Sequence, residues 1–202
     1  MFKQWAKNIS LMLIANNIIT FENREAYSYG IELFLFKFSL YIIVAVIALI
    51  THTLIPSAIF VISYTFLRQY NGGYHCKTAE MCIIVSIFMY LIFLLLYKLN
   101  YDNIKTFFFI SSCISFLPIF IFSPVENINN PLTVNEKRKY HIISIMIATV
   151  LVAIMILGYI FNVSNICYAV SYALTADAVL IILGLRRNKN EKACNESDSD
   201  DS

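Results

Sequence analysis

Long apolar segments, separated by short polar turns, recur along almost the whole of this chain. Six of them are candidate membrane spans, at about residues 33–50, 54–67, 81–97, 106–122, 142–161 and 166–185. Hydrophobic residues make up 59% of the chain and charged residues 14%, against about 25% charged residues in a soluble domain. So little charge cannot supply a polar surface, and lipid must cover much of the protein. The chain is therefore predicted to be all-α, a polytopic membrane helical bundle of about six transmembrane helices.

The two ends of the chain differ from its apolar middle. Apolar residues from Phe2 to Leu13 recur at roughly helical spacing, which indicates an amphipathic helix lying in the membrane interface, with a frayed terminus as the alternative. The C-terminal end begins with Arg186 and Arg187 and finishes with acidic residues, a composition typical of disorder. We therefore expect an N-terminal interfacial segment (residues 1–30), a six-helix transmembrane domain (residues 31–185) and a disordered cytoplasmic tail (residues 186–202).

The second span is the weakest of the six. Residues 54–67 number 14, and at about 1.5 Å per residue they cover roughly 21 Å of a hydrocarbon core about 30 Å thick. The helix must therefore extend at its ends, or Arg68 must snorkel to the interface.

Basic residues are distributed very unequally between the two sides that six spans define. Twelve Lys and Arg residues fall on one side, whereas Lys98 and Lys105 fall on the other. This bias predicts a multi-pass membrane protein with both termini in the cytoplasm. The twelve residues are Lys3, Lys7, Arg24, Arg68, Lys77, Lys137, Arg138, Lys139, Arg186, Arg187, Lys189 and Lys192.

The polar segment between spans two and three carries most of the reactive side chains. Gly72 and Gly73 allow a sharp backbone path after the second span. Thr78 is a plausible N-cap, which would put Cys82 in the first turn of the third span, where the helix dipole favours a thiolate. An imidazole from His75 would complete the requirement for a nucleophilic thiol.

Spacing alone leaves alternatives to this pair. On one continuous helix His75 and Cys82 would lie about 10 Å apart along the axis, too far for a hydrogen bond. The pair therefore requires His75 to lie in a loop that folds back over the helix start. A loop with an incidental His and Cys explains the same residues. A metal site at His75, Cys76 and Cys82 has unhelpful spacing and no fourth ligand, so we expect no metal and no cofactor.

A family resemblance bears on this choice. Arg68, the run Gly72-Gly73-Tyr74-His75 and the later Cys82 resemble the signature of the accessory gene regulator protein B (AgrB) family. Members of that family are polytopic membrane cysteine peptidases of Gram-positive bacteria. Chain length, six spans and a basic, Pro-containing loop after span four are also similar, so the resemblance covers most of the chain.

The resemblance implies roles for individual residues. Cys82 would be the nucleophile and His75 the catalytic base, with Arg68, Gly72 and Gly73 in support. Cys76 has no role in the family pattern and competes with Cys82 for the role of nucleophile. The three basic residues after span four would contact an acidic part of the substrate, although setting topology and binding anionic lipid explain them equally well: Lys137, Arg138 and Lys139.

The implied reaction is processing of a quorum-sensing propeptide. A membrane cysteine endopeptidase would cleave an AgrD-type precursor in its C-terminal part and retain the remainder as a thioester. An internal Cys or Ser of the peptide would then close a thiolactone or lactone ring, the autoinducing peptide. Residues 31–185 would be the catalytic domain. The resemblance also allows a homodimer in contact with lipid, and no nucleic-acid partner is expected.

Two other classes of function remain open from the residues themselves. Asp177 lies in the middle of the sixth span, where an ionisable residue should face the bundle interior and find a partner. Lys37 is the candidate partner by depth. Together these residues would support a small polytopic membrane transporter, although no inverted repeat is visible. A non-enzymatic membrane scaffold is the third class.

Overall fold

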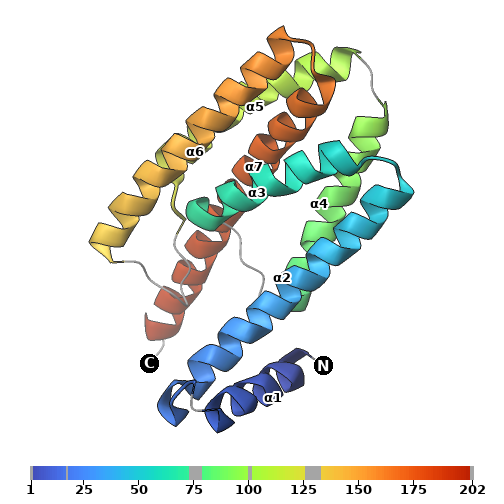
Figure 1. Cartoon of the computed structure of the whole chain (residues 1–202). Helices are drawn as coiled ribbons and strands as arrows, with labels where there is room; N and C mark the ends of the chain where they lie inside the picture. Colours follow the sequence, from blue (N-terminus) through green and yellow to red (C-terminus); the bar gives the residue numbers. More distant parts are fainter. Residues whose placement is uncertain (1, 17, 73–78, 100–101, 126–132, 201–202) are drawn as a thin grey trace. The chain divides into compact units, whose positions relative to one another are not determined.

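The computed structural model describes residues 2–16, 18–72, 79–99, 102–125 and 133–200, and this part of the chain is almost entirely helical (Figure 1). The prediction of an all-α membrane bundle is confirmed. The elements are α1 (Phe2–Ala15), a 3-10 helix η1 (Phe21–Asn23), α2 (Arg24–Ile50), α3 (Leu54–Asn71), α4 (Ala79–Leu99), α5 (Asp102–Phe122), α6 (Val134–Ile160) and α7 (Ser164–Asp200).

Among the described residues, four helical segments are long and apolar enough to cross a membrane: Phe21–Ile50, Met81–Leu99, Val134–Ile160 and Ser164–Lys189. A fifth apolar segment, Thr106–Phe122, is shorter. The predicted count of six is therefore approximate. Helix α3, where the sequence also placed its weakest span, is in neither group, because the last turn of this helix is polar. Large apolar side chains stay exposed along α2, α5 and α6, as a lipid-facing surface requires.

The chain divides into two compact units, Met1–His52 with Cys76–Tyr90, and Thr53–His75 with Leu91–Ser202. In the first unit α1 packs against α2. Ala6 and Ser10, one turn apart on α1, are fully buried, and the rings of Phe2 and Phe36 lie 4.8 Å apart. The N-terminal helix is therefore present, and its place in the membrane interface remains a prediction.

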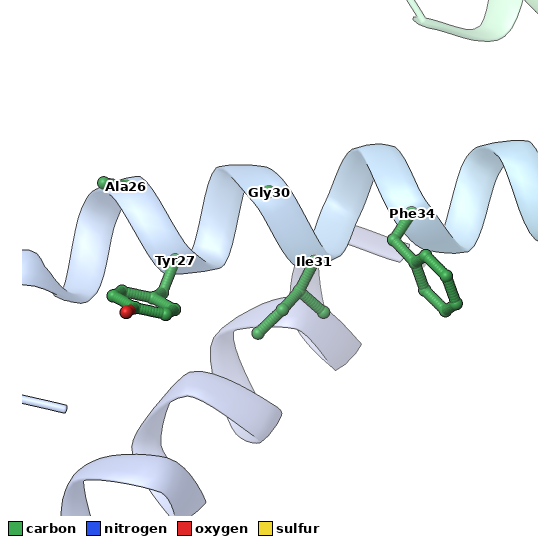
Figure 2. Close-up of a pocket in the computed structure, with 5 residues that line it drawn as sticks. All are labelled: Ala26, Tyr27, Gly30, Ile31 and Phe34. Carbon is green, nitrogen blue, oxygen red and sulfur yellow. The ribbon is translucent and has the colours of Figure 1, made fainter. Parts of the chain in front are cut away.

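A shallow apolar pocket lies on α2 at residues 26–34 (Figure 2). Tyr27, Ile31 and Phe34 extend from one side of the helix, while the small residues Ala26 and Gly30 leave the recess between them. A Cβ atom added at Gly30 would meet nothing within 4 Å. The pocket is thus a shallow depression on an exposed surface of the helix, and no charged side chain lines it.

Helix α7 forms the centre of the second unit, where it packs against α3, α5 and α6 (Figure 1). In its apolar stretch 72% of the residues are buried, against 28% in α6. Small residues such as Ala169 and Ala173 make this close packing possible. Aromatic rings fill the space around Tyr172, with Phe60 and Phe93 at centroid distances of 5.5 Å and 5.6 Å.

Several helices extend beyond the spans that hydropathy predicted, and the extensions are longest at α2, which begins at Arg24 rather than near Leu33, and at α6 and α7. Helix α7 continues past Leu185 to Asp200, so the backbone is helical over most of the segment predicted to be a disordered tail. Helix α6 begins at Val134 rather than near Ile142. Hydropathy missed this start because the first turns of α6 are polar and a side-chain cap, not an apolar face, begins the helix.

The cap at the start of α6 is a reciprocal capping box. The hydroxyl of Thr133 accepts a hydrogen bond from the backbone N–H of Glu136 at 3.4 Å. The Glu136 carboxylate accepts one from the backbone N–H of Thr133 at 3.0 Å. Two backbone donors that a helix start leaves unpaired are thereby satisfied.

Replacing Thr133 with alanine is expected to lower the free energy of unfolding by about 1 kcal/mol, because one donor of the first turn loses its acceptor. In a protein of this size that loss lowers the thermal midpoint by roughly 2–4 °C, measured on protein purified in detergent. Thr149→Ala is the matched control in the same helix, since the Thr149 hydroxyl donates only to the carbonyl of Ile145 among described contacts. Equal midpoints for the two variants would contradict the cap.

Candidate functional site

The C-terminal end of α3 carries the first described residues of the predicted site. Arg68 lies half-buried in the last turn, and its guanidinium donates a hydrogen bond to the carbonyl of Gly72. Gly72 ends the helix with φ 67° and ψ −130°, a conformation that only glycine adopts readily. Arg68 thus closes the last turn of the helix through a carbonyl that would otherwise have no intrahelical partner.

Gly72 also lies directly against another part of the backbone. It forms an isolated parallel bridge with Val125, which follows α5. A Cβ atom at Gly72 would stand 2.3 Å from the Val125 carbonyl oxygen, closer than two atoms can approach. The sequence suggested a sharp turn at this glycine, and the structure adds a close approach that excludes any side chain.

Asn71, the last residue of α3, joins three segments of the chain. Its side-chain amide donates to Oδ2 of Asp177 on α7. Its side-chain oxygen accepts from the Ser123 hydroxyl at 3.2 Å, and its backbone oxygen accepts from the Val125 N–H at 2.9 Å. Asn71 and Asp177 both have no exposed surface. Together these four residues form a buried polar cluster, called the α3 anchor below: Asn71, Ser123, Val125 and Asp177.

Asp177 has partners within its own unit. Depth in the membrane made Lys37, a residue of the other unit, a candidate, and within the second unit the structure gives Asn71 as the hydrogen-bond donor and Arg68 as a nearby positive charge. An Asp in the middle of a spanning helix costs about 2.5–3.5 kcal/mol, so it must find such partners. Depth in the membrane does not determine which helices are neighbours, whereas these bonds do so within the second unit.

The start of α6 lies beside the end of α3. The rings of Tyr70 and Tyr140 meet edge to face with centroids 6.1 Å apart. Nδ1 of His141 donates to the carbonyl of Ser123, next to the anchor. The basic run directly precedes Tyr140 in the chain, so this packing brings the run near the end of α3. Its residues, all exposed on the first turns of α6, are Lys137, Arg138 and Lys139.

Cys82 belongs to the other unit and lies near the start of α4, as its predicted place in the first turn of a helix requires. Its thiol is free and half-buried. Its backbone carbonyl accepts a hydrogen bond from the Ser86 hydroxyl at 2.8 Å, a bond that does not involve the thiol. Of the other described cysteines, Cys113 is exposed in the middle of α5 and Cys167 is buried in α7.

The structure describes only one residue of the predicted catalytic pair, Cys82. His75 and Gly73, together with Cys76, lie outside the described residues. Arg68 and Gly72 share the end of α3, and Cys82 is described by itself in its own unit. In the part of the chain that the structure describes, no three His, Cys, Asp or Glu side chains gather as a metal site requires.

Sequence reasoning missed Asn71, Ser123 and His141 as parts of this region. Asn71 stands directly before the Gly-Gly pair, and its type gives no signal by itself. The one signal available was Asp177, an acidic residue inside an apolar run, which demanded a partner. A search of the polar residues that end the other helices would have included Asn71.

A family model described as "Accessory gene regulator B" matches residues 6–183 of this chain. A "Putative AgrB-like protein" of Listeria innocua serovar 6a (strain ATCC BAA-680 / CLIP 11262) is 31% identical over 125 residues, which are 58% of this chain and 59% of that protein. This chain therefore spans about three fifths of the length of that relative.

Two further relatives extend the likeness. A "Putative AgrB-like protein" of Clostridium perfringens (strain SM101 / Type A) is 26% identical over 172 residues, or 81% of this chain and 78% of the relative. The "Accessory gene regulator protein B" of Staphylococcus carnosus (strain TM300) is 28% identical over 126 residues, covering 62% of this chain and 65% of that protein. No solved structure matches the chain.

Proposed function

This membrane protein belongs to the accessory gene regulator B family, and we propose that it acts in agr quorum sensing as a cysteine endopeptidase on an AgrD-type precursor peptide. The observation that carries the proposal is Cys82, a free, half-buried thiol at the start of α4. Reactive cysteines commonly occupy such positions, partly exposed and at the start of a helix. His75, seven residues earlier in the chain, is the proposed base.

The reaction follows the chemistry of thiolate acyl transfer. The Cys82 thiolate attacks the carbonyl carbon of a peptide bond in the precursor, and backbone N–H groups at the start of α4 are proposed to stabilise the resulting oxyanion. The C–N bond breaks as the imidazolium of His75 gives its proton to the leaving amine. The C-terminal fragment departs and a thioester on Cys82 remains.

Ring closure uses the energy stored in that thioester. An internal Cys or Ser of the precursor attacks the thioester carbonyl, and its proton passes through His75 to the departing thiol of Cys82. The product is a thiolactone or lactone, and the enzyme is regenerated. Water must be kept from the thioester for the ring to form, which a site at the membrane surface favours.

Roles for the other residues that the family resemblance singled out are proposed from their positions in the chain. Arg68 holds the end of α3 through Gly72, three residues before His75. Gly73 would permit the backbone path from there to His75. The exposed basic run on α6 is proposed to contact an acidic C-terminal part of the precursor: Lys137, Arg138 and Lys139.

Mass analysis of membranes that contain this chain and its precursor tests the proposal. The precursor to use is a short amphipathic peptide with an internal Cys or Ser and an acidic C-terminus, encoded beside this chain. We expect a C-terminal fragment and a cyclic product whose masses sum to that of the precursor, since ring closure consumes no water. A sum larger by one water would mean hydrolysis instead of cyclisation. An intact precursor in those membranes would overturn the proposal.

A further inference from the structure

We propose that Asn71 and Asp177 are positioning residues, a buried pair that holds the C-terminal end of α3 and thereby sets the place of the His75 base. This inference rests on the function proposed above, because it assigns a role toward that same site. The pair belongs to the α3 anchor, and all of its members lie in one compact unit.

The bonds of Asn71 differ in kind from most polar contacts in these helices. The hydroxyls of Ser86 and Thr175, for example, donate to carbonyls one turn earlier on their own helices. Such bonds satisfy a polar group without fixing the place of the helix. Asn71 instead reaches Asp177, 106 residues away in sequence, and Ser123 on a third segment. These bonds fix where α3 ends relative to α7 and to the residues after α5.

A second residue of α3 reinforces the pair. The amide of Asn71 donates to Oδ2 of Asp177, whose carboxyl group is fully buried. Arg68, one turn before Asn71, interacts electrostatically with the same carboxylate and also closes the helix through Gly72. The last turn of α3 is therefore held through both its side chains and its backbone.

Proximity in sequence connects this anchor to the proposed chemistry. Only two residues separate Gly72 from His75, so we expect a displacement of the end of α3 to displace the base as well. A misplacement of about 1 Å in a catalytic group can cost on the order of 100-fold in rate. A packed apolar pair at positions 71 and 177 would avoid the cost of burying polar groups in the membrane, but it would lack a directional hydrogen bond between the two helices. We therefore infer that the polar pair serves position and not only stability.

The first experiment does not depend on peptidase activity. Cys76 is kept as the sole cysteine in the full chain, with Cys82, Cys113, Cys167 and Cys194 changed to Ala, and its rate of labelling by a maleimide is measured in membranes. Asn71→Ala and Asp177→Ala are each expected to change that rate roughly tenfold, the effect of leaving one buried polar group without its hydrogen-bond partner. The exchange Asn71→Asp with Asp177→Asn keeps the bond and should restore the rate.

The second experiment measures cleavage of the precursor by the otherwise unchanged chain. We expect Asn71→Ala and Asp177→Ala to lower kcat roughly tenfold or more with little change in KM, since the base and not substrate binding is displaced. The exchanged pair should recover most of kcat, because Arg68 stays one turn from the carboxylate at position 71.

Tyr97→Phe is the matched control for both experiments. Its hydroxyl donates to Oδ1 of Asn165 at 2.7 Å, so this variant also removes a polar contact to α7 but leaves the end of α3 untouched. It should label and cleave like the original chain. Should the single variants fail to accumulate in the membrane, the exchanged pair alone decides, since it is expected to fold.

The outcomes separate this inference from the proposed function. Labelling that follows the prediction, together with an original chain that never cleaves the precursor, supports the anchor and overturns the peptidase. Cleavage by the original chain, with labelling and kcat unmoved in Asn71→Ala and Asp177→Ala, overturns the anchor alone. The anchor is also overturned if the exchanged pair accumulates but recovers neither the labelling rate nor kcat.

Discussion

Replacing Cys82 with alanine is expected to lower formation of the cleaved C-terminal fragment by roughly 1,000-fold or more, because acyl transfer has no nucleophile without the thiolate. The protein itself should accumulate normally. The hydrogen bond from Ser86 goes to the backbone carbonyl of Cys82 and survives the change, and alanine is the best helix former for this place in α4. The fragment is quantified by mass spectrometry in membranes that also contain the precursor.

Cys113→Ala is the control for this prediction, since Cys113 is an exposed thiol in the middle of α5, away from any helix start. It should cleave like the original chain. Cys76→Ala tests the competing nucleophile. If Cys76→Ala alone abolishes cleavage and Cys82→Ala does not, the thiol has been wrongly assigned. Thioester trapping on the wild-type chain, followed by peptide mapping, should locate the acyl group on Cys82.

Gly72→Ala is expected to destabilise the protein by roughly 2–4 kcal/mol, the sum of backbone strain and a lost contact. The backbone at Gly72, with φ 67° and ψ −130°, is open to glycine and costly for alanine. The added Cβ would also lie 2.3 Å from the Val125 oxygen. Relief of that clash moves Val125 away and breaks the bond from its N–H to Asn71. Thermal unfolding in detergent measures the loss.

Gly30→Ala provides the matched control, because a Cβ there meets nothing within 4 Å and the residue lies inside α2. Alanine in a helix interior should leave stability unchanged or raise it by up to about 1 kcal/mol. The same substitution is thus expected to act in opposite directions at two glycines. Equal thermal midpoints for the two variants would show that Gly72 does not approach Val125 as described.

Local properties of the sequence were sufficient for the class of fold and for the candidate nucleophile. Hydropathy responds to apolar runs that lie within one helix, so the helices at α2, α4, α6 and α7 could be predicted before their packing was known. The same holds for Cys82 near a helix start, since a polar segment followed by an apolar run marks where a helix begins. The weakness of the span at residues 54–67 was also visible from its length.

The start of α6 was predicted wrongly because a capping motif, and not hydropathy, determines where this helix begins. The start of α6 was placed near Ile142 because its first turns are polar, whereas the capping box at Thr133 begins the helix earlier. A capping box depends on only two residues, which are difficult to recognise in a sequence among other polar side chains. The basic run at residues 137–139 therefore lies on a helix and not in a loop.

Only the tertiary structure shows which contacts hold the end of α3, the helix that precedes the proposed base in the chain. The sequence determined a membrane helical bundle and a Cys–His motif, because both are properties of neighbouring residues. It could not pair Asp177 with Asn71, since that bond joins residues 106 positions apart and depends on which faces of α3 and α7 meet. Nor could it show that Gly72 lies against Val125. Contacts between distant segments arise from packing, and hydropathy carries no information about which helices are neighbours.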